Sequence, residues 1–188
     1  DLERISSVAP IPNFLGDKLN YESLRLVPHP YSWDPSAGVC NLCVPINIVF
    51  DDIEIINSAY QSALELGSRL NLNLLSNSIN ELNEKASTTL KLKFQDLSDD
   101  SSYKITITSD DVEVVAGDES GFYYGLVSLM QLAQTYHQLI PCGSIFDTPR
   151  FSWRGQHLDT VRHFYSVDSL LKLLDLMSLF KLNKFHWH

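Results

Sequence analysis

The C-terminal stretch constrains the fold most, because it is predicted to form a strand, a helix and a second strand in succession. Strands are predicted over Arg154–Leu158 and Asn183–His188, and a helix is predicted over Val167–Lys181, after the good N-cap residue Ser166. Two strands joined by a helical crossover pair in parallel. A parallel pair needs further strands and cover on both faces. We therefore expect the last strand to belong to a sheet that these residues do not complete.

Three short segments in the middle of the chain alternate strictly between apolar and polar residues, as strands with one buried face do. They are Thr89–Phe94, Tyr103–Thr108 and Val112–Ala116, and the Ser109–Asp111 link between the last two is typical of a hairpin. One buried and one solvated face favour an antiparallel sheet. Nearby prolines restrict the Leu24–Val27 segment to an edge strand.

Two helices are predicted to cover this sheet. Helical spacing extends over Ile53–Leu70, after a strand-like run at Pro45–Phe50, and a strongly apolar helix is expected over Gly121–Tyr136. With both helices on one face, these elements predict an α+β domain built on an antiparallel sheet. At Asp147 this pattern ends, and a proline breaks the chain before the C-terminal strand–helix–strand pattern begins. We therefore expect an α+β domain over residues 1–147 and a separate strand–helix–strand unit over residues 148–188.

The charge of the chain excludes one class of partner. The sequence has 23 acidic and 14 basic residues, giving a net charge of −9. Binding to nucleic acid needs a basic surface, so no nucleic acid partner is expected and a neutral substrate suits the chain better. No apolar run approaches the roughly 20 residues that cross a bilayer. The first residues, DLERISSVAP, have no secretory signal but begin with Asp instead of Met, which leaves the compartment open.

The loop after the strand at 154–158 carries the most informative polar residues, Asp159, Arg162 and His163. In β-α units the functional residues gather at the carboxyl ends of the strands and in the loops that follow them. The guanidinium of Arg162 is a rigid fork that can bind two adjacent acceptors, such as neighbouring sugar hydroxyls or a carboxylate. The alternative is a structural Arg162 paired with Asp159 or Asp168, and Asp159 and His163 would then only orient the arginine or fix the loop.

Two histidines, His186 and His188, are expected on one face of the final strand, opposite Phe185 and Trp187. Two imidazoles at this spacing could bind one metal ion, as in barrel hydrolases that use zinc. Such a site needs further ligands, which the sequence does not indicate, and paired histidines more often line a site or form hydrogen bonds. A metal-dependent barrel hydrolase using His186 and His188 is therefore an alternative to a metal-free site.

Cys40 and Cys43 form a lone CxxC pattern. A zinc knuckle would need two more close ligands, and a redox CxxC should open a helix, whereas a strand-like run follows here. The pattern therefore indicates two packed thiols or an incidental loop disulfide.

The segment DTPRFSWRGQHLDTVRHFYSVDSLLKLLDLMSLFKLNKFHWH, from Asp147 to His188, closely resembles the start of the catalytic barrel of the family-20 glycoside hydrolases, the β-N-acetylhexosaminidases. That family's pattern D-x-P-R-F-x-x-R-G-x-x-L-D-x-x-R-H-F, followed by a helix and K-x-N-x-x-H-x-H, matches here at every fixed position. Upstream, YKITITSDDVEVVAGDESGFYYGLVSLMQL is similar to the end of the family's small α+β domain, and VAPIPN is similar to its opening strand. The resemblance implies that residues 148–188 begin a (β/α)8 TIM barrel.

The resemblance also implies a retaining mechanism in which the 2-acetamido oxygen of the sugar attacks its own anomeric carbon. The implied substrate is an oligosaccharide with a terminal N-acetylhexosamine, GlcNAc or GalNAc, and no cofactor or metal is implied. Arg162 matches the arginine that binds hydroxyls of this sugar, and Asp159, His163, His186 and His188 would support it. The family's acid/base Glu and the Asp before it have no counterpart in this chain. We therefore expect it to be inactive alone and to need the remainder of its own barrel.

A non-enzymatic alternative is that the α+β domain acts as a scaffold or a glycan-binding module. The sequence shows no exposed aromatic ladder for such a role. Trp33, Tyr21 and Tyr31 are the aromatic residues that mutation would test.

Overall fold

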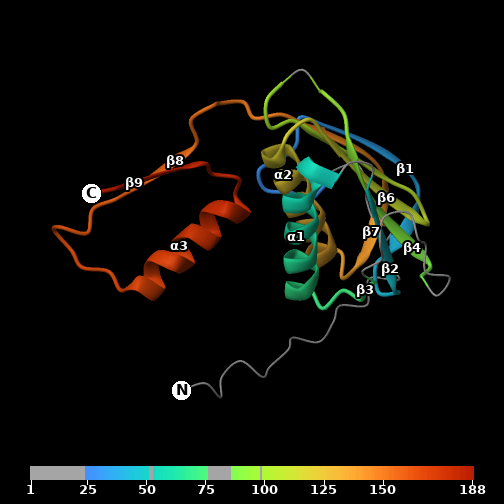
Figure 1. Ribbon diagram of the computed structural model, residues 1–188, viewed down its shortest axis with the longest axis horizontal. Helices are drawn as coiled ribbons and strands as arrows, with labels where there is room; N and C mark the ends of the chain where they lie inside the picture. The colour runs from blue at the N-terminus through green and yellow to red at the C-terminus, as the bar shows by residue number, and fades with distance from the viewer. Residues whose placement is uncertain (1–23, 51–52, 76–85, 98) are drawn as a thin grey trace, which may run out of the picture.

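A computed structural model describes residues 24–50, 53–75, 86–97 and 99–188. Tyr21 and the VAPIPN segment lie outside the described residues. The strands form a seven-stranded sheet, in the order β1-β7-β5-β6-β4-β2-β3, and a separate two-stranded sheet of β8 and β9 (Figure 1). The elements are β1 (Ser32–Asn41), β2 (Ile46–Phe50), α1 (Ile53–Arg69), β3 (Leu74–Leu75), β4 (Thr88–Phe94), β5 (Tyr103–Ile107), β6 (Asp111–Ala116), α2 (Glu119–Thr135), β7 (Leu139–Asp147), β8 (Gly155–Leu158), α3 (Val167–Leu179) and β9 (Lys184–Trp187).

The seven-stranded sheet confirms the α+β class, but it is mixed, so the prediction of an antiparallel sheet is wrong. Strand β4 pairs in parallel with both β2 and β6, while β5 is antiparallel to β6 and β7. The predicted hairpin is present between β5 and β6. Its second strand inserts between β5 and β4, which makes β6 run in the same direction as β4. Alternation reports which face of a strand is buried and does not report the direction of its neighbour.

The edge strand predicted at Leu24–Val27 is also wrong. Leu24 and Leu26 are buried, but their backbone is irregular, and the edge strands of the sheet are β1, a few residues later, and β3. Strand β7, the partner of β1, was not predicted either. Prolines and glycines interrupt both strands, and the register of the pair shifts between Pro35 and Val39, so neither strand shows a clean alternation.

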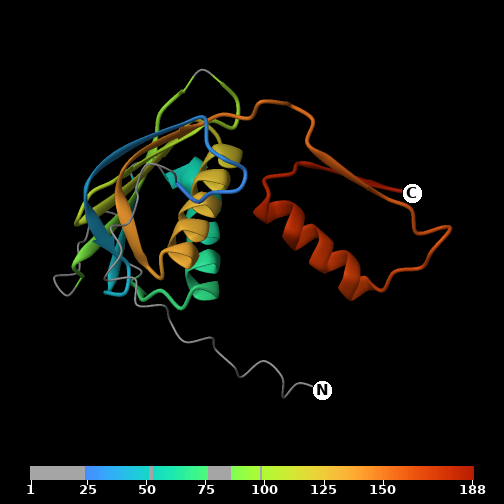
Figure 2. The same ribbon diagram turned by 180° about the vertical axis from the view of Figure 1, so that it is seen from behind.

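Helices α1 and α2 confirm the two predicted helices and lie side by side on the same face of the sheet (Figures 1 and 2). Both views also show them between the sheet and the β8-α3-β9 unit. Helix α2 therefore has neighbours on most of its circumference, and 11 of its 17 residues are buried. Its N-cap is Asp118, whose two carboxylate oxygens accept hydrogen bonds from the backbone nitrogens of Gly121 and Ser101, both at 2.6 Å.

Two glycines lie where α2 comes closest to the sheet. A Cβ atom on Gly121 would overlap the backbone oxygen of Ser102, and a Cβ atom on Gly125 would lie 2.8 Å from Cγ1 of Val114. A flexible side chain can turn aside, whereas a backbone oxygen within the chain cannot do so without moving its neighbours. The missing side chain at Gly121 therefore sets how closely the first turn of α2 approaches the sheet.

The β8-α3-β9 unit contains the parallel strand pair predicted from the sequence. Gly155, Gln156, His157 and Leu158 pair in register with Lys184, Phe185, His186 and Trp187. Ser166 is the N-cap of α3, as predicted, and its hydroxyl accepts a hydrogen bond from the backbone nitrogen of Ser169 at 3.2 Å. Among the described residues, no helix combines the length and the apolar character that a membrane crossing requires.

All three cysteines are free thiols, with Cys40 and Cys142 buried and Cys43 exposed. Burial is the largest cause that raises the pKa of Cys40, to about 12. The structure therefore agrees with packing of the Cys40 thiol, one of the two alternatives left by the CxxC pattern, and not with a loop disulfide between Cys40 and Cys43.

We expect Gly121→Ala to lower the free energy of unfolding by about 1–3 kcal/mol, because the new methyl group must displace the backbone at Ser102. Helix propensity alone would raise that free energy by about 1 kcal/mol, so the sign of the change separates the two effects. Urea unfolding of the purified variants measures it. Ser120→Ala, at an exposed position of the same helical turn, is the control and should change stability by less than about 0.5 kcal/mol. An unchanged or raised stability of Gly121→Ala would contradict the packing argument.

Candidate functional site

The loop between β8 and α3 lies against the carboxyl end of β9. The backbone nitrogen of His188 donates to the carbonyl oxygen of Leu158 at 2.9 Å, and the backbone nitrogen of Thr160 donates to the carbonyl oxygen of His188 at 2.8 Å. Because β8 and β9 are parallel, their carboxyl ends meet here, and residues of the loop come close to residues at the end of β9. This is the edge of a β-α unit where functional groups gather.

Asp159 and Arg162 form the ion pair at the centre of this loop. Nε of Arg162 lies 3.3 Å from Oδ2 of Asp159. The other oxygen, Oδ1, accepts hydrogen bonds from the backbone nitrogens of Val161 at 2.9 Å and Arg162 at 3.1 Å. The Arg162 side chain is 86% exposed, whereas that of Asp159 is only 20% exposed. The carboxylate is therefore fixed to the loop, and the guanidinium extends from it into solvent.

The electrostatics of Asp159 favour its ionised form. The hydrogen bond from the backbone nitrogen of Arg162 is the largest cause that lowers the pKa of Asp159, and the His188 side chain lowers it further. Nδ1 of His188 lies 3.3 Å from Oδ1 of Asp159. Three of the predicted residues, Asp159, Arg162 and His188, therefore meet in one cluster.

The other predicted histidines lie outside this cluster. The ring of His186 packs on that of His157 at 4.7 Å between centroids, and the rings of His157 and His188 are 6.2 Å apart. His163 packs edge-on against Tyr165 at 5.1 Å. Within the described ranges, no three His, Cys, Asp or Glu side chains form a group that could hold a metal ion. His186 on β9 and His188 directly after it both face the imidazole of His157, so they lie on one side of the chain, as predicted.

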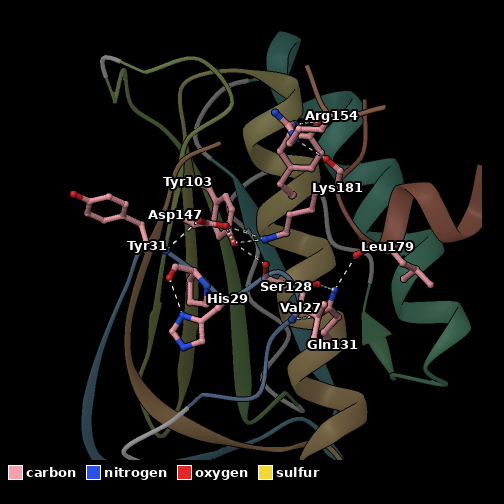
Figure 3. A network of polar contacts seen from close by, with 12 residues as sticks. Val27, His29, Tyr31, Tyr103, Ser128, Gln131, Asp147, Arg154, Leu179 and Lys181 are labelled. Atoms are coloured by element: carbon pink, nitrogen blue, oxygen red, sulfur yellow. Dashed lines mark hydrogen bonds and ion pairs between the residues drawn. The ribbon is translucent and has the colours of Figure 1, made fainter. Parts of the chain in front are cut away.

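A second polar cluster, which the sequence did not reveal, joins α3 to the seven-stranded sheet (Figure 3). Nζ of Lys181 lies 3.0 Å from Oδ2 of Asp147 and 2.6 Å from the hydroxyl of Tyr103. That hydroxyl also donates to Oδ2 of Asp147 at 2.8 Å and lies 2.7 Å from Oγ of Ser128. We call these four residues, Lys181, Asp147, Tyr103 and Ser128, the junction cluster.

The junction cluster is buried, and burial dominates its electrostatics. The side chains of Lys181 and Asp147 are 6% and 13% exposed. Burial is the largest cause that lowers the pKa of Lys181, and Asp147 opposes this effect. Burial is also the largest cause that raises the pKa of Tyr103, followed by the charge of Asp147. Burial therefore disfavours the charged form of Lys181, and the Asp147 carboxylate favours it.

Arg154 and residues of α2 extend this contact with further hydrogen bonds. Nη2 of Arg154 donates to the hydroxyl of Tyr124 at 2.9 Å, and Nε of Arg154 donates to the carbonyl oxygen of Lys181 at 2.8 Å. Nε2 of Gln131 donates to the carbonyl oxygens of Val27 at 2.8 Å and Leu179 at 2.9 Å (Figure 3). One helix therefore holds the segment before β1 and the end of α3 at the same time.

A cavity of about 230 Å³ adjoins the junction cluster. Tyr103, Tyr124, Asp147, Arg154 and Lys181 are among the residues that line it. It lies at the amino ends of β8 and β9, whereas the Asp159–Arg162 loop lies at their carboxyl ends. The cavity and the loop are therefore at opposite ends of the β8-α3-β9 unit.

The sequence contained one signal for the junction cluster. Asp147 and Lys181 of the junction cluster, and Arg154 beside it, are fixed positions of the family pattern. A lysine at the end of a helix is usually explained by solvation or by the helix dipole, so the burial of Lys181 could not be recognised. Tyr103 is the first residue of an alternating strand and was interpreted only as part of the core.

Two family models match this chain. The one described as "Glycosyl hydrolase family 20, domain 2" covers residues 23–148, and the one described as "Glycosyl hydrolase family 20, catalytic domain" covers residues 151–188. The chain belongs to glycoside hydrolase family 20. The alternative reading as a metal-dependent hydrolase of another family is therefore wrong.

Curated relatives of this family-20 chain carry related names. A beta-hexosaminidase of Vibrio vulnificus is 30% identical over 172 residues, which is 88% of this chain and 18% of that protein. A beta-hexosaminidase of Akkermansia muciniphila is 36% identical over 118 residues, which is 57% of this chain and 23% of that protein. The family-20 chain thus spans about a fifth of the length of these relatives.

Solved family-20 structures share the fold. An inactive mutant of the exo beta-N-acetylglucosaminidase from Vibrio harveyi superimposes with a TM-score of 0.72 at 29% identity, covering 87% of this chain and 25% of that chain. The same Vibrio harveyi enzyme in complex with N-acetylglucosamine gives a TM-score of 0.69 at 30% identity over the same shares of the two chains. The beta-N-acetylhexosaminidase from Streptomyces coelicolor gives a TM-score of 0.71 at 27% identity, covering 87% of this chain and 34% of that chain.

We expect Asp147→Asn to destabilise the protein by about 3–5 kcal/mol, because it leaves the buried Lys181 ammonium without a counter-charge. Lys181→Met should cost less, since Asp147 keeps its hydrogen bonds from the hydroxyl of Tyr103 and the backbone nitrogen of Tyr31. The double variant should cost less than the sum of the single variants. Denaturant unfolding of all three measures the coupling.

The matched control is the exposed pair of Lys91 and Asp111, whose Nζ and Oδ2 atoms are 2.7 Å apart with side chains 42% and 38% exposed. Lys91→Met should cost no more than about 1 kcal/mol. Additive effects of Asp147→Asn and Lys181→Met would show that the two charges of the junction cluster do not stabilise each other.

Proposed function

We propose that this chain is part of a β-N-acetylhexosaminidase that removes terminal non-reducing N-acetylhexosamine from oligosaccharides. Residues 1–147 would form the non-catalytic α+β domain, and residues 148–188 would form the first β-α-β unit of the catalytic (β/α)8 barrel. The match to both family models and the names of the relatives support this assignment. The parallel β8–β9 pair, joined by the α3 crossover, suits the start of such a barrel.

The observation that carries the proposal is the exposed guanidinium of Arg162, which extends from a fixed carboxylate at the carboxyl ends of two parallel strands. In this proposal its forked donors bind two adjacent hydroxyls of the terminal sugar. Asp159 orients the fork, because its Oδ2 lies beside Nε and leaves the two terminal nitrogens of the guanidinium for the substrate. His163 and His186 then belong to the walls of the site.

The reaction proposed for the complete barrel is substrate-assisted. The 2-acetamido oxygen attacks the anomeric carbon, the bond to the leaving group breaks, and a water molecule later opens the oxazolinium intermediate with retention of configuration. An acid/base Glu and the Asp before it, on barrel residues outside this chain, would protonate the leaving group and orient the acetamido group. The task of this chain is to hold the sugar ring so that the acetamido oxygen reaches the anomeric carbon.

Arg162→Ala in the full-length enzyme should lower kcat/KM for a chromogenic N-acetylglucosaminide by at least about tenfold. Losing charge-assisted hydrogen bonds in the closed complex costs roughly 1.5–3 kcal/mol, and about 1.4 kcal/mol corresponds to a factor of ten in rate. Arg162→Lys should restore little of the loss, because lysine keeps the charge and lacks the fork. Steady-state kinetics measure both variants, and circular dichroism verifies that they are folded.

Lys172→Ala is the matched control, since it removes an exposed cation of α3 without touching the loop. Its kcat/KM should stay within about twofold of wild type. Wild-type kcat/KM in Arg162→Ala would reduce Arg162 to a structural residue. A full-length protein that hydrolyses neither N-acetylglucosaminides nor N-acetylgalactosaminides would overturn the proposed function itself.

A further inference from the structure

We infer that His188 is a positioning residue for Arg162 and that it acts through the carboxylate of Asp159. The inference rests on the proposed role of Arg162 as the arginine that binds the sugar. In this inference, His188 at the end of β9 helps to orient the substrate, but it contacts neither the sugar nor a metal ion.

The first observation is the division of the Asp159 carboxylate between two side chains. Oδ2 faces Nε of Arg162 and Oδ1 faces Nδ1 of His188, each at 3.3 Å. The backbone nitrogens of Val161 and Arg162 also donate to Oδ1. One oxygen is therefore fully engaged by the loop and β9, and the other remains available to the arginine.

The second observation is that the end of β9 cannot easily move away from this loop. The His188 backbone pairs on both sides with the β8 strand end, through Leu158 and Thr160. The indole nitrogen of Trp187 donates to Oγ1 of Thr160 at 2.9 Å, and the Thr160 hydroxyl also donates to the carbonyl oxygen of His188 at 3.1 Å. These contacts hold the backbone of His188, directly after β9, and so keep its imidazole beside Asp159.

The third observation is the exposure of the three side chains. Asp159 is 20% exposed, His188 is 56% exposed and Arg162 is 86% exposed. The terminal torsion of an aspartate is broad, and the backbone nitrogens of Val161 and Arg162 already hold one oxygen of the Asp159 carboxylate. Nδ1 of His188, 3.3 Å from that same oxygen, adds a side-chain partner that further limits how Oδ2 is presented to the guanidinium. The His188 imidazole thus positions the guanidinium of Arg162 without contacting the sugar that the guanidinium binds.

The test uses the full-length enzyme and four variants: His188→Ala, His188→Asn, Arg162→Ala and the double variant His188→Ala/Arg162→Ala. We expect His188→Ala to lower kcat/KM about three- to tenfold, mainly through a higher KM. Asparagine places an amide nitrogen near the position of Nδ1, so His188→Asn should return to within about twofold of wild type. A merely structural role of the ring would not be rescued by so small an amide.

The double variant separates this inference from the proposed function. If His188 acts through Arg162, adding His188→Ala to the Arg162→Ala variant should lower kcat/KM by less than about twofold. Multiplicative losses would overturn the inference, because they would mean that His188 contacts the substrate or supports the fold independently. An Arg162→Ala variant with wild-type kinetics would instead overturn the role of Arg162, whatever the His188 variants do.

His29→Ala is the control for removing an imidazole, since His29 is exposed in the segment before β1 and its Nδ1 lies 3.0 Å from the carbonyl oxygen of Pro30. Its kinetics should match wild type. Thermal melting of each variant shows whether a loss of activity follows a loss of folded protein. A His188→Asn variant that is folded and as impaired as His188→Ala would also overturn the inference.

Discussion

The arrangement of this molecule depends on one buried ion pair, between Lys181 and Asp147. A buried charge without a partner is strongly destabilising, so the two residues must stay together once each is enclosed. Lys181 ends the turn after α3 and Asp147 ends β7, so their contact joins the turn before β9 to the seven-stranded sheet. Arg154, just before β8, donates to the carbonyl oxygen of Lys181 and to the hydroxyl of Tyr124 on α2. Helix α3 runs from the loop that carries Arg162 to the junction cluster, so the ion pair holds the end of α3 that lies away from Arg162.

Local patterns predicted most of the secondary structure, and tertiary pairing explains the rest. Strands β4, β5 and β6 and both long helices were recognisable, because each repeats its apolar residues with the period of its element. The parallel pairing of β4 with β6 was not recognisable, since it arises from the place at which a hairpin strand inserts into the sheet. Strands β1 and β7 were missed because Pro35 and Gly143 interrupt them, and their pairing with each other supplies what their patterns lack.

The candidate site, like the secondary structure, was predicted only in part from the sequence. Arg162, Asp159 and His188 could be named from the sequence because loops after β-strands and a strict family pattern both point to them. The pairing of Arg162 with Asp159 was one of the alternatives that the sequence left open, and the structure shows this pair. The contact of His188 with Asp159 was not predicted, since parallel register alone brings the end of β9 beside the loop. The junction cluster joins residues of β5, α2, β7 and the turn after α3, four segments that are far apart in the chain. A buried lysine has the same sequence appearance as an exposed one, so only the folded structure distinguishes them.

The junction cluster bears on how family-20 proteins can exchange parts. Asp147 lies within the segment matched by the domain 2 model, and Lys181 lies within the segment matched by the catalytic-domain model. Asp147 and Lys181 are both fixed positions of the family pattern, so a segment exchanged with a protein that keeps this pattern brings one charge and meets the other. Exchange with a protein that lacks either position would leave a buried charge unpaired, which is strongly destabilising. A boundary near residue 150 therefore separates two charges that the fold requires together.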